Sequence, residues 1–172
     1  SYSAKVWQNG DWRDHLKVEG KNLIRSLNVK LNNGNIMNSI KFKLLIPETR
    51  NSYDEILGSL IAREVGFISP ETFEVNVNVN NNKSIMIFQE DASKELLERN
   101  KRRESAIFEG DESVLWNYEK RELFELEDVS LARMINSKWI LKGKSSQLIA
   151  IKSLKKLQDS YMEYTHNFGE NT

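Results

Sequence analysis

The chain has 172 residues, and its 25 basic and 25 acidic side chains cancel, which gives no support to a nucleic-acid or anionic-membrane partner. Its length and its ordinary 39% of hydrophobic residues predict one domain with a hydrophobic core. It contains no cysteine, which excludes disulfides, thiolate nucleophiles and cysteine-based metal sites, and its two histidines, His15 and His166, are far apart in the sequence.

The first fifty residues predict β-strands. A strand over 4–8 is followed by Asn9-Gly10, a two-residue turn signal that predicts a hairpin with a second strand over 13–18. Two further strands are expected over 26–31 and 40–46, where apolar and polar residues alternate. Pro47 ends the last of these, because proline cannot donate to a strand ladder.

A capped amphipathic helix is expected next. Ser52 and Glu55 have the spacing of a capping box, in which each side chain satisfies the other's free backbone N–H. Gly66 suits the position just past the helix end. The apolar stripe predicted to pack on the sheet consists of Ile56, Leu57, Leu60, Ile61 and Val65.

The remaining elements are a hairpin and then helices. Strands over 72–79 and 84–89 flank a run of three asparagines, the clearest hairpin signal in the chain. Helices are expected over 91–100, 130–141 and 145–164, with a short strand at 106–108. The order is α+β within a single domain, in which 1–90 is mainly β with one helix and 91–172 is mainly helical.

Targeting signals were sought at the N-terminus and along the chain. No apolar run approaches the length of a transmembrane helix, and the start has no basic stretch followed by an apolar one, as a signal peptide would. The first residue is Ser1 rather than methionine, so we expect a fragment or a processed chain.

Short motifs in one order between residues 10 and 116 resemble the N-terminal half of the spore-coat CotH kinase family of atypical protein kinases. They are GDWRDH at 10–15, FKLLIPETRN at 42–51, REVG at 63–66 with Pro70, EDASKELLE at 90–98, RRE at 102–104, and Glu112 with Trp116.

The resemblance implies a fold and an activity. It implies an antiparallel sheet with a packed helix like a kinase N-lobe, followed by a helical segment. It further implies ATP and Mg as cofactors, phosphoryl transfer to a protein substrate, and a bacterial envelope, spore-coat or secreted location. In the family the catalytic and metal-binding acids follow the helices that end this chain. We therefore expect an incomplete site, with no catalytic or metal residue assigned here, and no activity of the chain alone.

Two basic residues are candidates for contact with nucleotide phosphates, because phosphoryl transfer needs cations on the phosphates, and one acidic residue is a candidate to orient a lysine. Lys43 lies on the strand beside the proposed cleft, where it either reaches a phosphate or forms a solvated strand face. Arg50 precedes a helix N-terminus and is either a phosphate clamp or a surface arginine. Glu55 either orients a lysine from the helix or serves only in the capping box.

Gln89 and Glu90 leave the last strand where a hinge over the adenine would lie. Adenine recognition at a hinge uses backbone groups, so these side chains need not contact the base. The sequence also departs from the family: Asn81, Ile85 and Ser105 stand where its members carry glycine. These departures favour an alternative, a non-catalytic kinase-like interaction module of an envelope, coat or particle.

Overall fold

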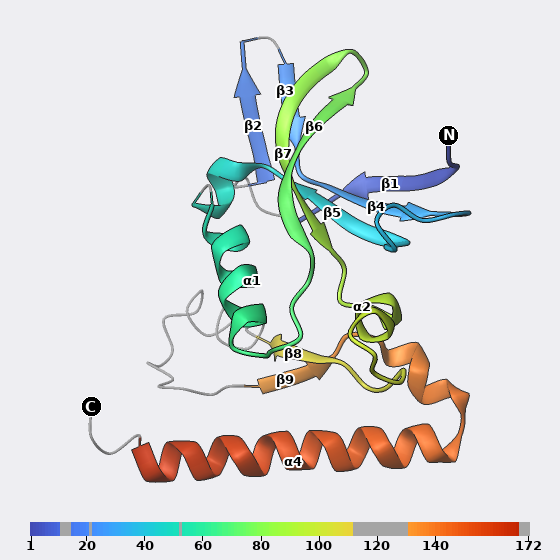
Figure 1. Cartoon of the computed structure of the whole chain (residues 1–172), viewed down its shortest axis with the longest axis vertical. Helices are drawn as coiled ribbons and strands as arrows, with labels where there is room; N and C mark the ends of the chain where they lie inside the picture. The colour runs from blue at the N-terminus through green and yellow to red at the C-terminus, as the bar shows by residue number, and fades with distance from the viewer. Residues whose placement is uncertain (11–14, 21, 52, 112–130, 169–172) are drawn as a thin grey trace, which may run out of the picture. The chain divides into compact units, whose positions relative to one another are not determined.

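The structure is a computed structural model, and Figure 1 shows its ribbon. The chain divides into two compact units, Ser1–Arg103 and Glu104–Thr172, and this boundary lies beyond the change at residue 90 that the sequence suggests. Each unit is described separately. The residues that the structure describes are 1–10, 15–20, 22–51, 53–111 and 131–168.

The largest sheet of the first unit is antiparallel, as the sequence predicts, and has five strands. Its strand order is β1-β4-β5-β7-β6 (Figure 1). The strands are β1 (Ala4–Gln8), β4 (Leu27–Leu31), β5 (Lys41–Leu45), β7 (Asn82–Glu90) and β6 (Thr72–Val79). The α+β class is confirmed, and the order places β1 and β6 at the two edges of the sheet.

The pairing of the first strand differs from the expected hairpin. β1 pairs with β4, and the Asn9 N–H donates to the Ser26 carbonyl at 2.8 Å. The strand expected over 13–18 is instead β2 (Leu16–Glu19), which pairs with β3 (Asn22–Arg25) in a separate two-stranded sheet. Because only a short connection separates β2 from β3, β3 is a nearer pairing partner for β2 than β1 is. Residues 11–14 lie outside the described part of the chain.

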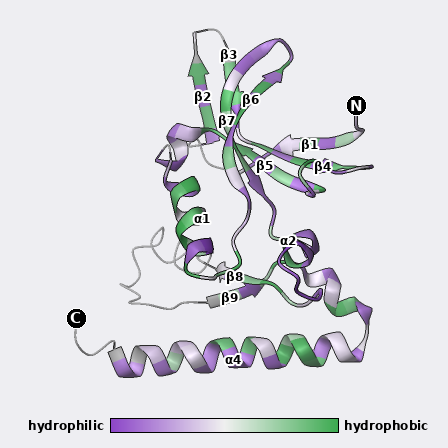
Figure 2. Cartoon of the chain, viewed as in Figure 1, coloured by the Kyte–Doolittle hydropathy of each residue, from purple (hydrophilic) through white to green (hydrophobic). Residues whose placement is uncertain are grey.

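The β6–β7 hairpin is confirmed. Its eight paired positions run from Thr72 opposite Gln89 to Val79 opposite Asn82. Asn80 and Asn81 form the turn with φ angles of 51° and 68°, as a type I′ turn requires of both central residues. Figure 2 shows this turn as hydrophilic.

The core lies on one face of the sheet, where alternate positions of four strands point the same way. The rings of Phe42 and Phe73 each stack on Phe88 with centroids 4.7 Å apart. The buried cluster and the half-buried residues around it are Val29, Leu31, Phe42, Phe88, Ile40, Leu44, Phe73 and Val75. The alternation in these strands therefore predicted the members of this cluster, but not Leu45, which follows Leu44 on the opposite face and is fully buried as well.

The helix α1 (Asp54–Glu64) follows the short 3-10 helix η2 (Pro47–Arg50). The expected packing of α1 is wrong, because Leu60 is 47% exposed and Ile61 is 55% exposed. The buried position is Ser59, whose hydroxyl hydrogen-bonds to that of Thr72 at 2.9 Å. Thr72 lies on a polar part of the sheet, and buried polar groups require hydrogen-bond partners, so α1 turns polar residues toward it.

The helix starts also differ from expectation. Tyr53 is the N-cap of α1 and makes no side-chain capping bond. The expected capping box depends on Ser52, which lies outside the described residues. The helix expected from 91 is α2 (Lys94–Arg99), with Ser93 as its N-cap. Asp91, expected as that cap, instead pairs with Lys41 at 2.7 Å.

The second unit contains β8 (Phe108–Asp111), β9 (Leu131–Met134), η3 (Ser137–Lys142) and α4 (Lys144–Phe168). The long C-terminal helix is confirmed. The helix expected over 130–141 is wrong, because β9 and η3 occupy that range. Asn136 explains this change: its side chain accepts from the Ile107 N–H at 2.8 Å and donates to the Ser105 carbonyl at 2.7 Å, which ties the segment to β8. No described helix is long and apolar enough to cross a membrane.

Candidate functional site

Three of the five candidate residues meet in one cavity of the first unit. Arg50 from η2, Glu55 from α1 and Gln89 from β7 line a space of about 560 Å³. The other lining residues are Thr49, Asn51, Asp54, Gly58, Ser59, Ser69 and Pro70. The cavity is thus formed by the segment before α1, the sheet-facing side of α1 and the end of β7.

Glu55 joins the other two residues of this group. Its Oε2 accepts a hydrogen bond from Gln89 Nε2 at 2.9 Å, and its Oε1 lies 3.4 Å from Arg50 Nη1. The side chains of Arg50 and Glu55 are 34% and 29% exposed, so both remain accessible from the cavity. Glu55 therefore contacts Gln89 and Arg50, whereas one of the two roles expected for it was to orient a lysine.

The guanidinium of Arg50 is only partly satisfied. Its Nε is buried and has no hydrogen-bond partner among the described residues. A buried donor without a partner costs free energy. Two carboxylates, those of Asp54 and Glu55, line the cavity beside this one guanidinium, so the lining has no net positive charge and attracts an anion only through Arg50 itself.

The local backbone explains the position of Arg50. Pro47 begins η2, as its fixed φ angle favours. Asn51 ends η2 in the left-handed conformation, with φ 47° and ψ 39°, and its N–H donates to the Pro47 carbonyl. This tight turn brings Arg50 next to the first turn of α1, where Asp54 and Glu55 supply the negative charge that a helix N-terminus favours.

Lys43 lies near this group but does not line the cavity. Its Cα is paired with that of Gln89 in the β5–β7 ladder, so both side chains are on the same face of the sheet. Lys43 is half-buried. No ion pair between Lys43 and a carboxylate occurs within the described ranges, so its expected role in phosphate contact stays a prediction.

Glu90 is placed differently from the other candidates. Its side chain is 1% exposed and pairs through Oε2 with Arg99 Nη2. The same Oε2 accepts from the Glu71 N–H at 3.1 Å, and the Glu90 N–H donates to the Glu71 carbonyl at 2.9 Å. Because Glu90 neighbours Gln89 on a strand, the two side chains point to opposite faces, and the carboxylate of Glu90 serves the packing of the sheet end.

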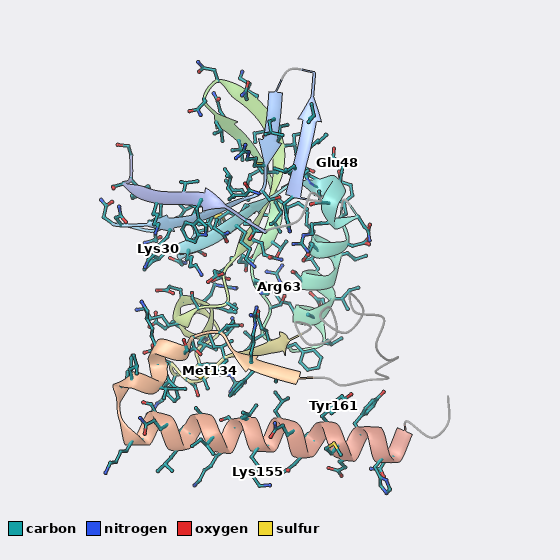
Figure 3. The ribbon with its side chains drawn as sticks, turned by 180° about the vertical axis from the view of Figure 1, so that it is seen from behind. Lys30, Glu48, Arg63, Met134, Lys155 and Tyr161 are labelled. Carbon is teal, nitrogen blue, oxygen red and sulfur yellow. The ribbon has the colours of Figure 1, made fainter. Side chains whose placement is uncertain are left out.

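A chain of ion pairs that the sequence analysis missed surrounds Glu90. Arg99 also binds Glu71 at 2.8 Å, and Arg63 of α1, labelled in Figure 3, binds Glu71 at 2.7 Å. The chain links α1, the start of β6, the end of β7 and α2. The paired residues are 8 to 28 positions apart in the sequence, so no local spacing rule pointed to them.

One carboxyl group beside η2 has a shifted pKa. Lys17 donates a hydrogen bond to Glu48, which is labelled in Figure 3, and this bond lowers the pKa of the Glu48 carboxyl below its ordinary value. The two residues line a second cavity of about 490 Å³, together with Tyr53 and Ile85. This pair is a local electrostatic feature of the first unit.

Among the residues that the structure describes, no cluster of three or more histidine, aspartate or glutamate side chains is placed to hold a metal ion. Comparison with known proteins adds no assignment, because no protein-family model and no curated protein sequence matches this chain.

Proposed function

We propose that this chain is the nucleotide-binding, N-terminal portion of a CotH-like atypical protein kinase, which binds ATP weakly by itself. The observation that carries the proposal is the meeting of Arg50, Glu55 and Gln89 in one cavity. A volume of about 560 Å³ lies within the usual range of about 300–1,000 Å³ for small-molecule sites.

The arrangement of the first unit supports the proposal. Three antiparallel strands, β1, β4 and β5, precede α1, and the β6–β7 hairpin follows it within the same sheet. The motif that suggested the family, at 42–51, contributes Lys43 and Arg50, and both lie beside the end of β7. The side chain of Arg50 is 34% exposed, so a ligand phosphate in the cavity would accept a charge-assisted hydrogen bond from its terminal guanidinium nitrogens.

The cavity suits phosphate better than a metal ion. Mg²⁺ is held by several oxygen ligands. Asp54 and Glu55 both line the cavity, but Glu55 is already bound to Gln89 and Arg50. These residues do not fit a metal site, and no step of the proposed function depends on one.

The affinity should be low for an electrostatic reason. The cavity lining has one guanidinium against the two carboxylates of Asp54 and Glu55, so it offers no net positive charge to a triphosphate. We expect a dissociation constant near about 1 mM, which corresponds to a binding free energy of about 4 kcal/mol.

Calorimetric titration with Mg-ATP tests the proposal. We expect weak binding to the natural chain and none to an Arg50→Ala variant. Arg133→Ala is the matched control, since Arg133 is exposed on β9 in the second unit and pairs only with Glu109 among the described carboxylates. Equal binding by the natural chain and Arg50→Ala, or no heat at millimolar nucleotide, would exclude the proposed site.

A second candidate function is an interaction module without catalysis. The exposed apolar residues of α1 favour it, with Leu57 55% exposed beside Leu60 and Ile61. Single exposed apolar residues are ordinary, but a group on one helix suggests a contact surface. A Leu57→Lys, Ile61→Lys variant that no longer assembles into the particle or envelope fraction, while it still folds, would support this candidate.

A further inference from the structure

The edge strand β6 carries an unusual combination of length and composition. It has eight residues, TFEVNVNV, and it is the last strand on its side of the sheet. Edge strands are normally short, or they carry lysine, proline or a bulge that blocks pairing with another chain. β6 has none of these, because its only charged residue is Glu74 and its ladder with β7 runs without a bulge.

The opposite edge provides a contrast. β1 has five residues and carries Lys5, which lies 5.7 Å from the ring centroid of Trp7. A lysine on an edge strand is a common obstacle to pairing. Of the two edges of this sheet, β6 is the one whose sequence leaves its backbone open to another strand.

The hydrogen bonds to β7 establish which backbone groups of β6 point outward. The Glu90 N–H donates to the Glu71 carbonyl, so Glu71 and each second residue after it face β7. The alternation in an antiparallel ladder then directs the N–H and C=O groups of Glu74, Asn76 and Asn78 away from β7. These three residues present the hydrogen-bonding edge to a partner.

We propose that β6 pairs antiparallel with β6 of a second copy of this chain, with Asn76 opposite its own counterpart. Two-fold symmetry makes such a contact self-complementary and closed. In this register Glu74 faces the partner's Asn78, so no two carboxylates are opposed. A register shifted by two residues toward the start of β6 would place Glu74 opposite Glu74 of the second copy. Two carboxylates would then face each other, which disfavours that register.

Side-chain packing supports the same register. Val75 would face the partner's Val77, and Phe73 would face the partner's Val79, which is 41% exposed in the single chain. Pairs of β-branched residues, or of a β-branched and an aromatic residue, stabilise neighbouring strands. Both pairs lie on the face of the sheet that holds the core, so dimer formation would extend the core across the two-fold axis.

A single introduced cysteine tests the register directly, because the natural chain has no cysteine. In Asn76→Cys the two Cα atoms would lie about 5.5 Å apart, within the disulfide range of about 4.4–6.8 Å. In the matched control Asn78→Cys the two positions would be about 13 Å apart along the strands. Under mild oxidation we expect a covalent dimer from Asn76→Cys and not from Asn78→Cys.

Mass measurement of the full chain by light scattering completes the test. We expect the mass to double with rising concentration, and Asn76→Pro to remain monomeric. Proline at position 76 removes only an N–H that points away from β7, so the hydrogen bonds between β6 and β7 are kept. Asn76→Lys is a second variant that should block dimer formation. Asn76→Thr is the control that should still dimerise. Circular dichroism checks that each variant folds. A mass that never doubles, or equal cross-linking of the two cysteine variants, would overturn the proposal.

Discussion

Arg99 of α2 donates from Nη2 to the buried carboxylate of Glu90, at the end of β7. The same guanidinium reaches Glu71 from Nη1 and the Ser69 carbonyl from Nη2. One arginine therefore fixes the end of one strand and the segment that leads into its neighbour. The stability of the first unit should depend strongly on this residue.

Arg99→Ala is expected to lower the free energy of unfolding by about 3–5 kcal/mol, because it leaves the buried carboxylate of Glu90 without its charged partner. Urea denaturation measures the loss. The matched control is Arg133→Ala, whose exposed pair with Glu109 should contribute about 0–1 kcal/mol. If the two variants lose similar amounts, the buried pair is not what holds the sheet end.

A second comparison uses the same substitution at a buried leucine, Leu45, and at an exposed leucine, Leu60. Leu45 is fully buried on β5, so Leu45→Ala should cost about 2–5 kcal/mol as a large-to-small change in a core. Leu60→Ala should cost less than about 0.5 kcal/mol, because its side chain is already 47% exposed. Chemical denaturation of both variants checks this ranking, and a larger loss for Leu60→Ala would mean that α1 packs through its apolar side.

The pair of Lys17 and Glu48 predicts a small pH dependence. The pKa of Glu48 is lowered in the folded chain, mainly by the Lys17 hydrogen bond. A lowered folded-state pKa stabilises the fold above the unfolded pKa, and this contribution is lost as pH falls through the folded pKa. Because Glu48 is 56% exposed, solvent screening should keep the contribution below about 1 kcal/mol.

NMR titration of the Glu48 carboxyl measures this directly. We expect Lys17→Met to raise the pKa of Glu48 toward its ordinary value and to weaken the acid dependence of stability between about pH 5 and pH 3. An unchanged titration in the variant would show that the hydrogen bond does not set the pKa.

The sequence predicted the parts of the fold that depend on local signals. Alternation along β5 and β6 placed Phe42 and Phe73 in the core, and the asparagine run placed the hairpin turn at Asn80 and Asn81. These predictions succeed because a period of two residues and a left-handed turn are properties of neighbouring residues.

The sequence did not predict what depends on distant partners. The apolar stripe of α1 indicated a core face, yet Thr72 on β6 draws Ser59 and the polar side of the helix to the sheet. Glu90 was a hinge candidate, and only the fold shows that Arg99 and Glu71 surround it. Of the candidate site, Arg50, Glu55 and Gln89 meet as a group, but no local pattern indicated that Glu55 bridges the other two.

We propose that the cavity at Arg50, Glu55 and Gln89 receives the phosphates of a nucleotide. Two-dimensional ¹H–¹⁵N NMR of the labelled chain, titrated with ATP, locates binding residue by residue. We predict concentration-dependent shifts centred on the amides of Arg50, Asn51, Glu55 and Gln89, which disappear in Arg50→Ala. Shifts centred on Lys83 and Ile85 at the second cavity, or no shifts at millimolar ATP, would contradict the account.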